Sequence, residues 1–248
     1  MASHAPPALT VDEIRRSLTE RDSGDRSWAA SLPPRPRHSA LRELFGDREM
    51  TGFGVFAGPA VSGKTALQIA VACDMASAGR GALILTVDTL RFMAVERVRR
   101  QATLWGLSEQ QIQQIAVDEL GDQPLKQRLL AEIADRQPAV IVVENVVHLA
   151  ARMPGGFDAA LRQCARGLAD LADTNDLLVL TDALPQATLG GETIPVARAL
   201  KQHASWVALC ERVARRSNRI TLRLDGTRGP ATTITLRDGR VPSHTDTT

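Results

Sequence analysis

The sequence predicts an α/β fold, in which helices flank a mainly parallel central sheet and antiparallel strands extend that sheet at its C-terminal end. The first observation is a glycine-rich motif, GPAVSGKT, which lies between a short apolar run and a helical pattern. The second is the alternation of apolar runs with helical patterns as far as residue 180. The third is a change after residue 205, where β-prone segments follow one another with little but turns between them.

The glycine-rich motif fits the phosphate-binding pattern G-x-x-x-x-G-K-[ST] in the context that this pattern requires. Residues 53–57 have the pattern of a buried strand, and residues 66–76 that of a helix. Glycines let backbone N–H groups converge on an anion, and a helix N-terminus adds partial positive charge. The alternative is a turn that only caps a helix. We expect phosphates to bind at Gly58, Pro59, Ala60, Val61, Ser62, Gly63, Lys64 and Thr65.

Two residues of this loop have the functional groups that phosphoryl transfer needs. Lys64 would reach the β- and γ-phosphates and stabilise charge there, and the hydroxyl of Thr65 would bind Mg²⁺. The sequence therefore predicts ATP and Mg²⁺ as ligands of this loop.

The rest of the chain supplies the strands and helices of the predicted sheet. The next strand is nearly all apolar, which indicates burial on both faces of a parallel sheet. We predict further parallel strands at residues 82–87, 139–143 and 177–180. Helical patterns occupy residues 93–104, 108–114, 124–136 and 157–172. The predicted antiparallel extension consists of residues 206–210, 219–224 and 232–236.

Length and composition favour one main domain with small appendages. A chain of 248 residues with 44% hydrophobic residues can bury a full α/β core. We predict a Pro- and Arg-rich arm at residues 1–39, a core domain at 40–241 and a disordered tail at 242–248. The arm either docks on a neighbouring subunit or an acidic partner, or is a loosely ordered tail. The formal net charge of +2 is too small to indicate nucleic-acid binding by itself.

The cysteines and the apolar runs predict a cytoplasmic protein, with association with the nucleoid as an option. Cys73, Cys164 and Cys210 are far apart in the sequence and have no C-x-x-C spacing, which favours reduced core residues. No apolar run approaches the roughly 20 residues that a membrane span needs. We therefore expect no membrane partner.

Carboxylates follow three of the predicted parallel strands, at Asp88, Glu144 and Asp182. Ligands of open α/β sheets bind beyond the carboxyl ends of the strands, so all three could surround the phosphates. Glu144 is placed like the acidic residue that holds Mg²⁺, usually through water, and its alternative role is an acidic cap on the next turn.

These strand ends and the phosphate loop resemble the core of RecA-like ATPases, a group that includes the RecA and RadA recombinases and the DnaB-type helicases. The C-terminal segment at residues 228–240 also resembles the closing hairpin of the DnaB-type helicases. The resemblance covers roughly residues 40–241. It implies a RecA-like P-loop NTPase core and a homo-oligomeric ring or filament, or a hetero-oligomer with a related ATPase. It further implies action on DNA, single-stranded DNA above all, in recombination, repair or replication.

Departures from the family predict slow hydrolysis. RecA and RadA proteins place a water-orienting glutamate where one register puts Leu90, whereas the helicase-like register puts Asp88 in that role. The recombinases have a γ-phosphate-sensing glutamine where this chain has Ala183, so Asp182 is the candidate sensor. Glu144 stands where an aspartate is usual. The alternative function is therefore a degenerate paralogue that acts as an ATP-dependent scaffold or regulator of a partner protein.

Clustered arginines are the candidate DNA contacts. The turn between two predicted strands carries Arg212, Arg215, Arg216 and Arg219, and a helix carries Arg97, Arg99 and Arg100. With 3% aromatic residues, the chain should contact the phosphate backbone rather than stack on bases. The alternative is a set of solvated surface arginines. In the helicase-like register Arg228 would act as a finger on a neighbouring subunit's γ-phosphate, although Gly226 replaces the basic residue expected two positions earlier, and its alternative is an ordinary hairpin residue.

Overall fold

The computed structural model describes residues 41, 42, 45, 51–87, 89–121, 124–189, 192–214, 217–225 and 231–242. The chain divides into two units, residues 1–32 and 33–248, and every described residue belongs to the second. The predicted arm at 1–39 lies outside the described residues, as does the predicted tail apart from Pro242. Four of the candidate site residues also lie outside them: Asp88, Arg215, Arg216 and Arg228.

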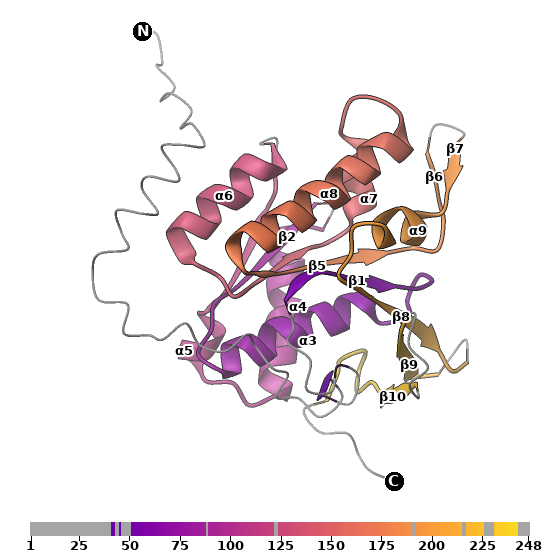
Figure 1. The fold of residues 1–248 in the computed structure, drawn as a ribbon. Coiled ribbons are helices and arrows are strands. Elements are labelled where there is room, and N and C mark those ends of the chain that lie inside the picture. Colours follow the sequence, from indigo (N-terminus) through magenta and orange to yellow (C-terminus); the bar gives the residue numbers. More distant parts are fainter. Residues whose placement is uncertain are drawn as a thin grey trace, which may run out of the picture. The chain divides into compact units, whose positions relative to one another are not determined.

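An eight-stranded sheet runs through the domain in the order β10-β9-β8-β1-β5-β4-β2-β3 (Figure 1). Its strands are β1 (Gly52–Ala57), β2 (Ala82–Thr86), β3 (Ile115–Glu119), β4 (Val140–Val143), β5 (Leu178–Ala183), β8 (Trp206–Arg212), β9 (Arg219–Leu224) and β10 (Thr232–Thr235). The six strands from β8 to β3 pair in parallel, while β9 and β10 pair antiparallel. A separate hairpin joins β6 (Ala187–Leu189) to β7 (Glu192–Ile194). The α/β prediction with an antiparallel C-terminal extension is confirmed.

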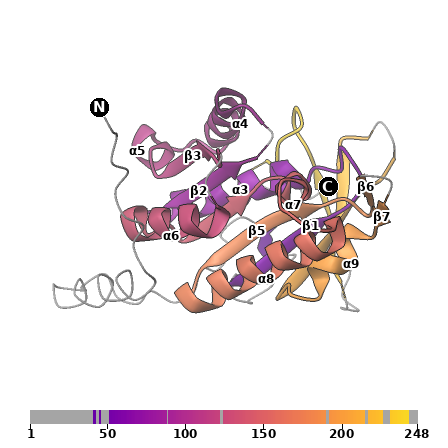
Figure 2. The ribbon, with the colours of Figure 1, turned by 90° about the horizontal axis from the view of Figure 1, so that it is seen from above.

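Helices cover both faces of this sheet, as Figures 1 and 2 show. One face carries α3 (Lys64–Ser77), α4 (Arg91–Leu104) and α5 (Glu109–Ile112). The other carries α6 (Leu125–Arg136), α7 (Val146–Ala151), α8 (Phe157–Asn175) and α9 (Val196–Lys201). None of the helices in the described ranges is long and apolar enough to cross a membrane.

The alternation of side chains along each parallel strand fills two separate hydrophobic cores. In β4, Val140 and Val142 pack toward α3, whereas Ile141 and Val143 pack toward α8. All of these side chains are fully buried. Burial of each such aliphatic side chain stabilises the fold by about 1.5–3 kcal/mol. Apolar residues are therefore needed at every position of these strands, which is the run pattern seen in the sequence.

An aromatic cluster joins the first strand to the late strand beside it. The ring of Trp206 makes edge contacts with Phe45 and Phe56, with centroid distances of 4.7 and 5.5 Å. A Cβ atom on Gly54 would lie 2.1 Å from the Trp206 ring. Glycine is therefore required at residue 54, because the indole occupies the space of a side chain.

The sequence prediction missed four features of the fold. The pattern at residues 108–114 is only the short helix α5, and a strand, β3, follows it directly. Ser108 and Gln111 form a reciprocal capping box that starts α5. The prediction also lacked α7, α9 and the β6–β7 hairpin, which are elements of at most six residues. Such short elements have too few residues to show a period.

Candidate nucleotide-binding site

The phosphate loop connects β1 to α3, as the motif predicts. Gly63 adopts a left-handed conformation, with φ 89°, directly before the first helical residue, Lys64. A side chain at this φ would be strained, and glycine avoids that cost. The loop therefore places the N-terminus of a 14-residue helix at the carboxyl end of a central parallel strand.

Lys64 is folded onto the loop that precedes it. Its Nζ donates hydrogen bonds to the carbonyl oxygens of Gly58 at 2.9 Å and Pro59 at 2.7 Å. Only 6% of the residue is exposed. Burial lowers the pKa of the Lys64 ammonium below its ordinary value, and the carboxylate of Asp182 partly counteracts this shift. An anion in the loop would replace these carbonyl contacts with a stronger charge–charge interaction.

The C-terminal strands form the bed on which the loop rests. A Cβ on Gly58 would lie 2.1 Å from the backbone oxygen of Cys210 in β8. A Cβ on Gly63 would lie 3.1 Å from the side chain of Ile220 in β9. The antiparallel extension thus explains why the motif needs glycine at both ends, in addition to the demands of phosphate binding.

The ends of β4 and β5 meet beside the loop. Oδ1 of Asp182 accepts a hydrogen bond from the backbone N–H of Asn145 at 2.8 Å, and the hydroxyl of Thr181 donates to the Val143 carbonyl at 2.8 Å. Ala183 accepts a hydrogen bond from the Gly58 N–H at 3.0 Å. The prediction that these strand ends converge on the phosphate loop is confirmed for β1, β4 and β5.

A cleft of about 570 Å³ opens over the loop. Asn145 and Asp182 line it on one side, and the turn at residues 238–240 lines it on another. Cationic side chains predominate among its lining residues: Lys64, Arg97, Arg100, Arg212 and Arg240. Its charge and its volume suit a ligand that carries several phosphates.

Glu144 has a different setting from the one that its sequence position suggests. The residue follows β4, but it is 5% exposed and is not among the residues that line the cleft. Thr65 and Asp182 line the cleft directly. Within the described part of the chain, no group of three or more His, Cys, Asp or Glu residues could hold a metal ion. Mg²⁺ in nucleotide sites usually has one or two protein ligands plus phosphate and water, so the donors present fit Mg²⁺ bound with a nucleotide.

The structure separates the predicted arginine cluster. Arg212 lies at the cleft and bonds to the phosphate loop, whereas Arg219 is exposed at the start of β9. Arg97 and Arg100, which the sequence grouped with DNA contacts, also line the cleft.

The sequence analysis missed Arg240 and Gln101 as residues of the site. Gln101 donates a hydrogen bond to the Val241 carbonyl at 2.6 Å and accepts one from the Val241 N–H at 3.1 Å. The Trp105 indole also donates to that carbonyl, at 2.8 Å. These contacts hold the C-terminal turn beside α4. A pairing over 140 positions leaves no local signal in a single sequence.

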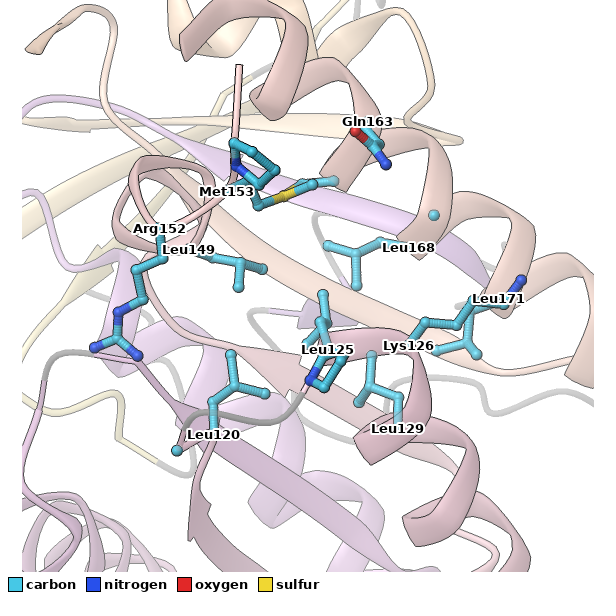
Figure 3. A pocket seen from close by; sticks show the side chains of 15 residues that line it. Leu120, Leu125, Lys126, Leu129, Leu149, Arg152, Met153, Gln163, Leu168 and Leu171 are labelled. Atoms are coloured by element: carbon cyan, nitrogen blue, oxygen red, sulfur yellow. The ribbon is translucent and has the colours of Figure 1, made fainter. Parts of the chain in front are cut away.

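A larger cavity, of about 810 Å³, lies between α6, α7 and α8 and contains none of the phosphate loop (Figure 3). Leu125, Leu129, Leu149 and Leu168 are among its mainly apolar lining residues, and Figure 3 shows Arg152 and Lys126 at two of its sides. Arg152 also donates a hydrogen bond to the Val87 carbonyl at 2.7 Å, beyond the end of β2. This cavity therefore touches the loop that contains residue 88.

Comparison with known proteins supports the fold. No protein-family model and no curated protein matches the chain. Among solved structures, the ATPase domain of a DnaB-like helicase matches with a TM-score of 0.64 at 13% sequence identity, over 94% of this chain and 98% of that one. The resemblance to RecA-like ATPases is thereby confirmed at the level of the fold. The chain has an α/β fold of the RecA-like type, with the phosphate loop at the carboxyl edge of its parallel strands.

Proposed function

We propose that this protein binds Mg-ATP in the cleft over the phosphate loop and hydrolyses it slowly, in work on DNA during recombination, repair or replication. One observation carries the proposal: Lys64 is buried, with its ammonium on the Gly58 and Pro59 carbonyls, in a cleft lined by arginines. A buried lysine of lowered pKa, next to a helix N-terminus, needs an anion to complete its charge balance.

The residues of the cleft have distinct roles in this proposal. Lys64 would exchange its loop carbonyls for the β- and γ-phosphates. Thr65 would hold Mg²⁺ directly and Glu144 through water, and the bound Mg²⁺ would stabilise negative charge on the phosphates. Asp88 is the proposed water-positioning residue, and Asp182 the proposed γ-phosphate sensor. Arg228 of a neighbouring subunit would complete the site in a ring or filament.

Slow turnover is expected from two side chains. Ala183 is buried, and its methyl group cannot bond to a phosphate. Leu90 is 58% exposed and cannot polarise a water molecule. Asp88 is then the only carboxylate proposed for that task, with a side chain one methylene shorter than glutamate.

Nucleotide binding is tested with a matched pair of lysine variants. Lys64→Ala should abolish detectable binding of Mg-ATP by calorimetry and leave the thermal unfolding transition in place. Lys201→Ala, in an exposed lysine of α9, should bind as the wild-type protein does. Equal affinity in all three folded proteins would refute the site. Steady-state ATPase with and without single-stranded DNA then measures turnover.

A second candidate function is an ATP-dependent scaffold or regulator. An exposed apolar group at the start of α4 favours it: Leu90, Phe92 and Met93 are 58%, 69% and 43% exposed. Exposed apolar groups of this kind mark protein-binding surfaces. ATP binding without any turnover, in the presence or absence of DNA, would favour the scaffold over the ATPase.

A further inference from the structure

Arg212, at the end of β8, makes a side-chain contact with the phosphate loop. Its Nε donates a hydrogen bond to the Val61 carbonyl at 2.5 Å, and its Nη1 donates to the Ser217 carbonyl at 3.1 Å. The register of the sheet explains the reach: β8 pairs in parallel with β1, and Leu209 lies opposite Ala57. The strand continues past this pair, so that Arg212 lies beside the loop that follows β1.

Val61 has a conformation that its own side chain disfavours. Its φ is 61°, in the left-handed region, where a β-branched residue is a genuine outlier. The side chain is 74% exposed, so core packing does not hold the residue in this conformation. Strained backbone persists only where the surroundings determine it. The two bonds of the Arg212 guanidinium supply such a restraint, because they fix the direction of the Val61 carbonyl.

The orientation of that carbonyl matters for phosphate binding. A trans peptide unit is planar, with its C=O and N–H pointing in opposite directions. When Arg212 holds the Val61 carbonyl, it therefore also sets the direction of the Ser62 N–H. That N–H points to the Pro59 carbonyl at 3.3 Å, the same oxygen that accepts from Lys64. The Ser62 N–H is thus directed into the loop, where a phosphate would bind.

We propose that Arg212 is a positioning residue, which holds Val61 in its left-handed conformation and so preorganises the phosphate loop for its nucleotide. The assignment rests on the proposed function. It replaces the interpretation of Arg212 as a DNA contact. Arg212 acts on the nucleotide through the loop backbone, and the planar fork of its guanidinium is what makes both bonds possible.

A double-mutant cycle with Val61 tests this mechanism. Arg212→Ala should raise the Kd for Mg-ATP by about 10-fold, because a charge-assisted restraint is lost. Val61→Gly removes the strain, since glycine adopts positive φ freely. In the Val61→Gly background, Arg212→Ala should therefore change the Kd by less than about 3-fold. Arg212→Lys keeps the charge without the fork and should bind as weakly as Arg212→Ala.

Three results would overturn the assignment. Equal losses in both backgrounds would mean that Arg212 contacts the nucleotide itself. Wild-type affinity in Arg212→Lys would mean that charge alone suffices. Wild-type affinity in Arg212→Ala would leave the residue without a role. Arg223→Ala, in an exposed arginine of β9, is the matched control and should behave as the wild-type protein does.

Hydrogen exchange separates this proposal from the nucleotide-binding function. In the nucleotide-free protein, amides of residues 58–65 should exchange about 5-fold faster in Arg212→Ala than in the wild type, and Arg223→Ala should leave them unchanged. Should the wild-type protein bind no ATP, the proposed function fails, while faster exchange in this segment would still support Arg212. Unchanged exchange would refute the positioning role whether or not ATP binds.

Discussion

Asp182 and Asn145 join the ends of β5 and β4, through a hydrogen bond of 2.8 Å from the Asn145 N–H to Oδ1 of Asp182. The same carboxylate raises the pKa of Lys64 against the larger effect of burial, which lowers it. One side chain thus fixes the geometry of the strand ends and helps keep the lysine charged.

The affinity for Mg-ATP should fall as the pH rises toward the ordinary lysine pKa of 10.5. Phosphate binds the protonated lysine, and bound phosphate raises its pKa. The binding free energy is therefore complete below the lowered pKa of the free site and decreases above it. Calorimetry between pH 7 and 10 in buffers of different ionisation enthalpy should show proton uptake on binding at the alkaline end.

Asp182→Asn provides the control for this pH dependence. Asparagine can still accept the hydrogen bond from Asn145, but it lacks the charge that raises the Lys64 pKa. The loss of affinity should therefore begin at lower pH than in the wild type. An identical profile in both proteins would mean that Lys64 does not determine the pH dependence.

A substitution at Gly58 should destabilise the fold even without nucleotide. In Gly58→Ala the new methyl would lie 2.1 Å from the Cys210 oxygen, so the free energy of unfolding should fall by about 1–3 kcal/mol. Gly167→Ala is the control, because that glycine lies in α8 with nothing near its Cβ position. It should gain about 0.5–1 kcal/mol from helix propensity. Urea unfolding measures both, and equal stability of the two variants would contradict the close packing at Gly58.

The sequence predicted the parts of the site that are local in the chain. The phosphate loop and its helix depend on residues within one short segment, and apolar runs mark β1, β4 and β5. The carboxyl edge of a parallel sheet then brought Asp182 to Lys64 by topology alone. Contacts such as Arg212 with Val61 could not be predicted, because they depend on the order and register of distant strands.

Burial also could not be read at single polar positions. Glu144 follows an apolar strand and was expected beside the phosphates, yet the next residue, Asn145, lines the cleft instead. The left-handed conformation of Asn145, with φ 58°, turns the chain directly after Glu144. Nothing in the apolar run predicts which of the two side chains reaches the cleft.

The three cysteines should resist thiol reagents in the native protein. All are buried and free of disulfides, and burial raises the pKa to about 12 for Cys73, about 11 for Cys164 and about 12 for Cys210. Thiolates are the reactive species, so labelling at pH 8 should be slow. A chromogenic disulfide reagent should titrate three thiols only after denaturation. Rapid modification of the native protein at Cys210 would show that β8 opens under the phosphate loop.

Arg152 should influence turnover from outside the cleft. Its hydrogen bond to the Val87 carbonyl fixes the residue before Asp88, the proposed water-positioning group. Arg152→Ala should therefore lower kcat by about 10-fold and leave KM nearly unchanged, because misplacement of a catalytic group costs rate rather than binding. Lys126→Ala, in an exposed lysine at the same cavity, should change neither constant. Parallel effects of the two variants would point to the cavity rather than to the Val87 contact.

DNA binding should depend on Arg219 and the adjacent Arg215 and Arg216, but not in the same way on Arg212. Each phosphate contact on single-stranded DNA contributes about 0.7 to the slope of log K against log salt concentration. Arg219→Ala should therefore flatten this slope by about that amount and weaken binding equally for unrelated sequences, since its guanidinium is exposed at the start of β9. Arg212→Ala should leave the slope unchanged without nucleotide, because its guanidinium is bonded to the phosphate loop and to Ser217. Arg166→Ala, in α8, is the control for a general loss of positive charge. Fluorescence anisotropy with labelled single strands at several salt concentrations measures the slopes. A wild-type protein that binds no DNA at low salt, with ATP present, would exclude the DNA-directed role and favour the scaffold.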